Sequence, residues 1–208
     1  MERTLALKGE LWTGRSLTDE IRIELLRKSL HLLIAFVPSL AALSLRYTVV
    51  LLILGTSFYG LCEALRLRGL TIPLVSRLTS MAARRRDAGR FVLGPVTLGL
   101  GALMALLLYP SPAASIAIYA LAFGDGLSSL IGKLFGSIRM PFTGGKSLEG
   151  SLTCLAAVFL AALLVCGSPL RALSLAVVAT IVEAIPSRDL DNLLLPVITG
   201  AAAALILR

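Results

Sequence analysis

One acidic side chain stands in the middle of a long apolar run. The segment LAFGDGLSSLIGKLFG places Asp125 between two glycines. A carboxylate at membrane depth is costly unless it is paired, protonated or bound to a cation. Glu183 lies inside a second apolar run, and Glu63 lies at the end of a third. Acids in such positions predict a functional site at one face of a membrane protein.

A second group of charged residues precedes the first long apolar run. The sequence ELLRKSLH has the spacing i, i+3, i+4 and i+7, which puts one set of side chains on a single helical face: Glu24, Arg27, Lys28 and His31. His31 is the only histidine of the chain. Two interpretations stay open. The group either anchors a helix at the inner membrane face, with an internal ion pair and a core histidine, or contributes to a site.

Small residues surround Asp125. They recur at every fourth position: Gly124, Ser128, Gly132 and Gly136. Gly126 follows Asp125 directly, and Ser129 lies on a neighbouring face of the same predicted helix. A ridge of small residues lets another helix, or a ligand, approach closely.

A glycine-rich segment, FTGGKSLEGS, follows this run. Backbone N–H groups of Gly144 and Gly145 suit phosphate oxygens, and Lys146 supplies a point charge. The spacing is not that of a Walker A loop. Equally, Ser147 or Ser151 could cap the next helix, with Glu149 in its first turn.

A late polar segment, EAIPSRDLDN, carries oxygen donors. Pro186 ends a helix, and Asp189, Asp191 and Asn192 follow it. Hard oxygen ligands of this kind suit Mg²⁺. The alternative is a polar loop in which Asp191 or Asn192 caps a helix.

The elements that must position these residues are membrane helices. Of 208 residues, 57% are hydrophobic and 15% are charged, with a mean hydropathy of +0.89. This composition excludes a disordered chain, a collagen and a disulfide scaffold, and it indicates a polytopic α-helical membrane protein. The net charge of +8 points to cytoplasmic loops that face anionic lipid and phosphorylated substrates, not to nucleic acid.

We expect a bundle of about seven transmembrane helices near these ranges: 29–45, 47–65, 91–109, 112–132, 150–167, 170–186 and 190–207. With the N-terminus in the cytoplasm, 17 of the 20 Lys and Arg residues fall on the inner side, and the C-terminus lies outside. Residues 1–28 form an interfacial or cytoplasmic segment, and residues 29–208 form a single transmembrane catalytic domain.

Together these motifs resemble the integral-membrane CTP-dependent polyprenol kinase family, which includes dolichol kinase, phytol kinase and CTP-dependent diacylglycerol kinase. The resemblance rests on RKSLH, on the block from GDGLSSLIGKLFG to KSLEGS, and on DNLLLP. It implies a lipid-alcohol kinase that transfers the γ-phosphoryl group of CTP, or of another nucleoside triphosphate, to a polyprenol-type alcohol at the cytoplasmic membrane face. Serines follow GDG where many relatives have alanine, which leaves the acceptor open.

The resemblance and the chemistry of phosphoryl transfer together suggest roles. Asp125, Lys146 and His31 are the expected catalytic residues, with Asp125 or His31 as the proton acceptor. Expected nucleotide or phosphate contacts are Arg27, Lys28, Gly124, Gly126, Lys133, Gly144, Gly145, Lys146, Ser147 and Glu149. Mg²⁺ is expected at Asp125, Glu149, Glu183 and Asp191. Further expected site residues are Glu24, Glu63, Ser128, Ser129 and Asn192.

Two other functions compete with this one. A phosphatidate cytidylyltransferase would also use CTP and a lipid, but its late K-D…HGG…DR…D signature is missing. An ion-coupled transporter would use Asp125 and Glu183 as a cation or proton site. We expect the plasma membrane of a prokaryote because no transit or retention signal is present. The partners are then the bilayer, the alcohol and the nucleotide; homo-oligomerisation stays open.

Overall fold

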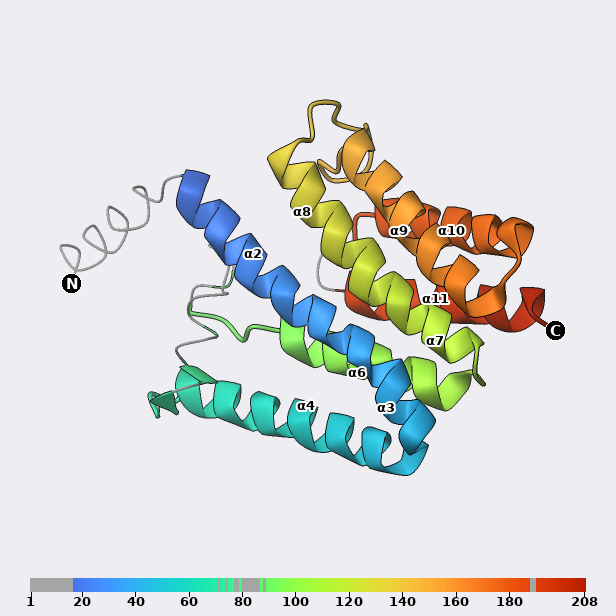
Figure 1. Cartoon of the computed structure of the whole chain (residues 1–208). Helices are drawn as coiled ribbons and strands as arrows, with labels where there is room; N and C mark the ends of the chain where they lie inside the picture. Colours follow the sequence, from blue (N-terminus) through green and yellow to red (C-terminus); the bar gives the residue numbers. More distant parts are fainter. Residues whose placement is uncertain are drawn as a thin grey trace.

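The computed structural model describes residues 17–70, 72–73, 75–76, 79, 87, 89–187 and 190–208, and this part of the chain is a bundle of helices (Figure 1). The elements are α2 (Leu17–Leu33), η1 (Ile34–Phe36), α3 (Val37–Leu43), α4 (Leu45–Leu67), α6 (Gly94–Leu108), α7 (Ala113–Tyr119), η3 (Ala120–Asp125), α8 (Gly126–Leu134), α9 (Leu148–Cys166), α10 (Pro169–Ala184) and α11 (Asp191–Ile206). The described residues contain no β-strand beyond one isolated bridge between Arg139 and Ser147. The predicted all-α fold is confirmed.

Several of these helices suit a membrane. Four in the described ranges are long and apolar enough to cross one: Ile23–Leu43, Leu45–Leu67, Ala113–Leu134 and Leu148–Cys166. Two shorter apolar helices are α6 and α11. The apolar helices indicate membrane association. The full number of seven spans and the orientation of the termini stay predictions.

The outer surface of the bundle supports this environment. On α4, Leu51, Leu54 and Phe58 are exposed, and on α9 Leu160 and Leu164 are exposed. Extended apolar surface of this kind is rare on soluble monomers. These exposed apolar side chains suit contact with the hydrocarbon core of a membrane.

One long helix, formed by α7, η3 and α8, runs through the middle of the bundle (Figure 1). Its side chains Ala117, Ile118 and Leu121 are fully buried. The segment η3 is a π-helical turn that ends at Asp125. Such turns are uncommon and occur frequently at functional sites.

The ridge of small residues packs against a helix. A Cβ placed on Gly150 of α9 would lie 2.8 Å from the carbonyl oxygen of Ser128, and one on Gly132 would lie 2.9 Å from Ser147 Oγ. Gly124 faces Val158 of α9 in the same way. The close partner of the ridge is therefore α9 along much of its length, while Ser128 and Gly132 also line a pocket.

The N-terminal part of the chain is described only from residue 17 onward. Residues 1–16 of the predicted interfacial segment lie outside the described residues. The predicted boundary between residues 28 and 29 falls inside α2, which continues from Leu17 to Leu33. The division into domains stays a prediction.

Candidate functional site

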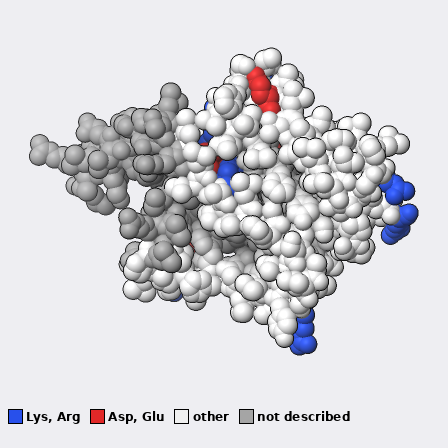
Figure 2. Space-filling view, viewed as in Figure 1, with Lys and Arg blue, Asp and Glu red and all other residues white. Residues whose placement is uncertain are grey.

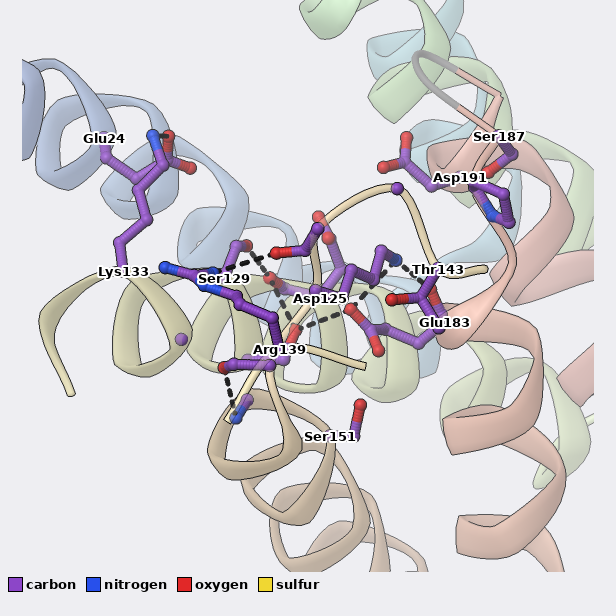
Figure 3. Close-up of a pocket in the computed structure, with 18 of the residues that line it drawn as sticks. Glu24, Asp125, Ser129, Lys133, Arg139, Thr143, Ser151, Glu183, Ser187 and Asp191 are labelled. Atoms are coloured by element: carbon purple, nitrogen blue, oxygen red, sulfur yellow. Dashed lines mark hydrogen bonds and ion pairs between the residues drawn. The ribbon is translucent and has the colours of Figure 1, made fainter. Parts of the chain in front are cut away.

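A pocket of about 600 Å³ lies where α8 ends and α9 begins (Figure 3). Its walls come from α2, α8, the loop that joins α8 to α9, the first turn of α9, the end of α10 and the start of α11. The structure brings twelve of the predicted site residues to this pocket: Glu24, Arg27, Asp125, Ser128, Ser129, Lys133, Gly144, Gly145, Lys146, Ser147, Glu183 and Asp191. Positions far apart in the sequence thus meet in one polar cavity.

Asp125 lies at the inner wall of this pocket and is held from α2. Lys28 Nζ donates a hydrogen bond of 2.6 Å to Asp125 Oδ2, and His31 Nδ1 lies 3.2 Å from the same oxygen. All three side chains are buried. Lys28 neutralises the carboxylate, and both contacts fall on Oδ2, so Oδ1 carries neither of them.

A second carboxylate on α2 binds two cations. Glu24 is 1% exposed; its Oε1 accepts from Arg27 at 2.7 Å, and its Oε2 accepts from Lys133 of α8 at 2.5 Å. Glu24 therefore ties α2 to α8 and holds two cations at the pocket wall (Figure 3). The predicted common face of α2 is the one that packs on the central helix.

The loop between α8 and α9 forms one side of the pocket. Gly144 and Gly145 have φ values of 70° and 94°, which side chains with a Cβ rarely adopt. Arg139 donates to the carbonyl oxygen of Gly145 at 2.9 Å, and Met140 N–H donates to that of Lys146 at 2.9 Å. These bonds fold the loop back, so that its cations and its glycines face the same cavity.

Lys146 connects this loop to α10. Its ammonium lies 3.0 Å from Glu183 Oε1 and also donates to the backbone carbonyl of Glu183. Ser128 of α8 donates to the same carboxylate oxygen at 3.3 Å. Glu183 is thus a meeting point of the loop, α8 and α10.

Two residues of the KSLEG segment stabilise the loop and the start of α9. Ser147 caps α9, since its Oγ accepts from Gly150 N–H at 3.2 Å. Glu149 Oε1 accepts from Ser137 N–H at 2.9 Å, from Ile138 N–H at 3.2 Å and from the Ser137 hydroxyl. Ser147 still lines the pocket, whereas Glu149 is not among its lining residues.

Other predicted site residues lie elsewhere. Glu63 binds Arg66 at 2.7 Å and accepts from Val92 N–H at 2.8 Å, so it joins α4 to the segment before α6. Asn192 donates to Thr97 Oγ1 of α6 at 2.9 Å. Neither residue lines the pocket. In both cases the polar side chain binds a residue far away in the sequence, and the sequence alone does not predict that contact.

Four more of the predicted residues lie behind or beside the cavity. Gly124 faces α9, and Gly126 faces Leu32 of α2. Lys28, expected as a phosphate contact, and His31 contact Asp125 without lining the pocket. These residues contact Asp125 or pack the helix on which it lies.

Sequence reasoning missed several polar pocket residues. Arg139, Thr143 and Ser187 line the cavity, and Ser151 does so as well, although it was considered only as a helix cap. Arg139 could have been predicted, because it is a cation five residues before the glycine pair. Ser187 and Thr143 carry no pattern that separates them from ordinary loop residues.

The donor set of the pocket bears on metal binding. The described residues contain no group of three or more His, Cys, Asp and Glu side chains that could hold a metal ion by themselves. Asp125, Glu183 and Asp191 nevertheless line one cavity, and the first two already pair with a lysine. Magnesium in nucleotide sites is held by one or two carboxylates, water and phosphate oxygens. The residues fit an ion that arrives with a polyphosphate, and they do not fit an all-protein metal cage.

Fold and site together define, over the described residues, a membrane-associated helical bundle with a charged pocket at one end. Comparison with known proteins agrees with the resemblance seen in the motifs. The chain is 31% identical over 169 residues to "Phytol kinase 1, chloroplastic" of Arabidopsis thaliana, covering 72% of this chain and 56% of that protein. It is 30% identical over 141 residues to "Farnesol kinase, chloroplastic" of the same plant, covering 60% and 46%.

A more distant similarity reaches an archaeon. An uncharacterised protein of Methanocaldococcus jannaschii is 25% identical over 130 residues, covering 62% of this chain and 65% of that protein. The chain spans about half the length of the plant relatives that it matches. No family model and no solved structure matches the chain.

Proposed function

We propose that this chain is a membrane kinase that transfers the γ-phosphoryl group of CTP, or of another nucleoside triphosphate, to the hydroxyl of a prenyl alcohol. The single observation that carries the proposal is the pocket, which combines cations, a glycine loop and buried carboxylates at one end of an apolar bundle. The similarity to proteins named phytol kinase and farnesol kinase supports a prenyl alcohol as the acceptor.

The proposed orientation places this pocket at the cytoplasmic face of seven spans. Three arginines support it, because they lie at the opposite helix ends: Arg46 at the start of α4, Arg171 at the start of α10 and Arg208 after α11. Figure 2 shows the isolated Lys and Arg side chains at the right and lower edges of the bundle, away from the loop between α8 and α9. We keep the prokaryotic plasma membrane as a proposal; the plant relatives are named chloroplastic, and one relative is archaeal.

Phosphoryl transfer needs charge neutralisation and in-line positioning more than covalent chemistry. Lys146 and Arg139 lie on the loop, and Arg27 and Lys133 lie on the opposite wall. We assign these cations to the triphosphate, with the N–H groups around Gly145 beside them. The nucleotide then bridges the two walls of the pocket.

Two carboxylates are assigned to the magnesium ion that accompanies the nucleotide. Asp125 has Oδ1 free of the Lys28 contact, and Asp191 has no ion pair within the described residues. When bound, Mg²⁺ would neutralise phosphate charge at this position. Lys28 and His31 then fix the direction of Asp125 from behind. Glu149, also expected as a ligand, does not line the pocket. Glu183, the other expected ligand, has one carboxylate oxygen bound to Lys146 and Ser128 and is assigned a different role.

One experiment tests this function against its rivals. Purified protein in detergent with Mg²⁺ receives γ-³²P-CTP or α-³²P-CTP, or UTP or ATP labelled in the same way, with phytol, farnesol, dolichol, diacylglycerol or phosphatidic acid. We expect label in an organic-soluble product from the γ-position only, and its loss in Asp125→Asn. Arg171→Gln, at the far end of the bundle, is the matched control and should keep full transfer.

The other outcomes are equally clear. Label from the α-position would establish a cytidylyltransferase. No transfer from any of CTP, UTP and ATP, in protein shown to be folded, would refute the kinase and favour the transporter. Transfer to diacylglycerol alone would keep the kinase and replace the acceptor class.

A further inference from the structure

One buried carboxylate of the pocket has an oxygen without a partner. Glu183 is 5% exposed, and its Oε1 is engaged by Lys146 at 3.0 Å and by Ser128 at 3.3 Å. Its Oε2 is buried and makes no hydrogen bond within the described part of the protein. A buried carboxylate oxygen left in this state is costly, so a ligand is expected to complete it.

A second polar group beside it is in the same state. Ser151 of α9 is 7% exposed, lines the same cavity, and its Oγ also makes no hydrogen bond among the described residues. Figure 3 shows the Ser151 hydroxyl directed toward Glu183 across the floor of the pocket. An acceptor and a hydroxyl that both lack partners suit a ligand hydroxyl, which can donate to one and accept from the other.

The two residues first expected to accept the proton are less well placed. Asp125 Oδ2 is occupied by Lys28 at 2.6 Å, with His31 at 3.2 Å. His31 does not line the pocket, so Asp125 separates it from any ligand there. Of the described carboxylates, Glu183 is the one with a buried, unoccupied oxygen on the cavity side.

The position of Glu183 also suits a lipid substrate. It stands on α10, whose only other charged residue is Arg171 at the opposite end. The side chains next to it on that helix include Val182, which is buried in the apolar core. A lipid alcohol that uses this position must bring its hydroxyl to Glu183 while the hydrocarbon part of the same molecule stays among apolar helices.

We propose that Glu183 is the catalytic proton acceptor for the alcohol and that Ser151 binds the same hydroxyl; this inference rests on the proposed kinase function. The O–H bond of the alcohol breaks, and its proton passes to Glu183 Oε2. The alcohol oxygen forms a bond to the γ-phosphorus of the nucleoside triphosphate. The bond from that phosphorus to the β–γ bridging oxygen breaks, and its electron pair leaves with the nucleoside diphosphate. Lys146 holds the other Glu183 oxygen and so fixes the carboxylate in place.

The test is Glu183→Gln, which keeps the size of the side chain and its bonds to Lys146 and Ser128 but cannot take the proton. We expect kcat to fall about 100-fold or more, because general base catalysis contributes at least that much. KM for the alcohol and for the nucleotide should stay within about threefold, since binding is retained. The Mg²⁺ concentration for half-maximal activity should not change.

Two further variants make the result independent of folding. Glu183→Asp keeps an acceptor at a shorter reach, and its kcat should lie above that of Glu183→Gln. Ser151→Ala should raise KM for the alcohol several-fold with a smaller effect on kcat. Ser174→Ala removes a half-buried α10 hydroxyl that donates to the Leu170 carbonyl oxygen, away from the pocket; it is the matched control and should resemble the parent protein. Binding of a non-hydrolysable CTP analogue should be equal in all variants.

The failures can be told apart. If the parent protein transfers no phosphoryl group, the proposed function itself is wrong. If the parent is active and Glu183→Gln keeps its kcat, the assignment of the proton acceptor is wrong and the kinase stands. If Glu183→Gln instead requires more Mg²⁺, Glu183 is a metal ligand and the assignment is overturned.

Discussion

The buried pair between Lys28 and Asp125 gives a prediction that does not depend on the substrate. The two side chains are 3% and 8% exposed and lie 2.6 Å apart, on helices 97 residues apart in sequence. At this separation, with an effective dielectric constant of about 20, two unit charges attract by about 6 kcal/mol. Desolvation offsets much of this attraction. Removing one partner leaves the other charge buried, which costs about 3–5 kcal/mol.

We therefore expect Lys28→Met to lower the free energy of unfolding by about 3–5 kcal/mol. The assay is equilibrium unfolding in mixed detergent and SDS micelles, followed by far-ultraviolet circular dichroism. The double variant Lys28→Met/Asp125→Asn should recover more than half of the loss, because it removes both buried charges.

The matched control is Lys133→Met, which breaks another lysine–carboxylate contact between α2 and α8. Lys133 lies 2.5 Å from Glu24, but its side chain is 46% exposed and Arg27 remains as a partner of Glu24. The expected loss is below about 1 kcal/mol. Equal losses in the two single variants, or no recovery in the double variant, would show that burial of the pair does not govern its energy.

Three other predictions follow from the structure. Glu149→Ala should speed hydrogen exchange at the Ser137 and Ile138 amides about tenfold or more, because these amides lose their acceptor. Glu149→Gln keeps an acceptor and should keep most of the protection of these amides. Equal exchange rates in the two variants would refute the loop contact. Gly150→Ala should destabilise the bundle by about 1–3 kcal/mol because of the carbonyl 2.8 Å away, while Gly55→Ala, with nothing within 4 Å, should be neutral or stabilising in the same unfolding assay. Chelation with EDTA should abolish phosphoryl transfer, and added Mg²⁺ should restore it; activity that persists in EDTA would remove the metal from the proposal.

Local spacing predicted the parts of the site that lie on one helix. The i, i+3, i+4, i+7 pattern put Glu24, Lys28 and His31 on a common face, and the structure buries that face against the central helix. The fourfold period of small residues predicted a close approach, which is the packing on α9. Both follow from helical geometry, which a sequence displays directly.

Contacts between distant elements could not be predicted in this way. The partners of Glu149 lie eleven and twelve residues away across a loop, and Val92 lies 29 residues from Glu63. Glu149 was predicted as a metal ligand and Glu63 as a further site residue, but backbone N–H groups bind one carboxylate oxygen of each. Which oxygen of Glu183 is left without a partner is likewise decided by the packing of α8, α9 and α10.

The packing of the far half of the bundle also bears on the choice between a kinase and a carrier. Ala172, Leu175 and Ala203 are fully buried between the pocket and the opposite end. A second cavity of about 450 Å³ at that end is lined mainly by apolar residues, with Arg208 as its one charged member. An ion-coupled carrier needs a path for its substrate to the other side of the membrane. Here the described acids of the central bundle meet at one end, so a nucleotide would enter and leave from a single aqueous face. A prenyl alcohol would meet it from the apolar side, with its tail still in the membrane.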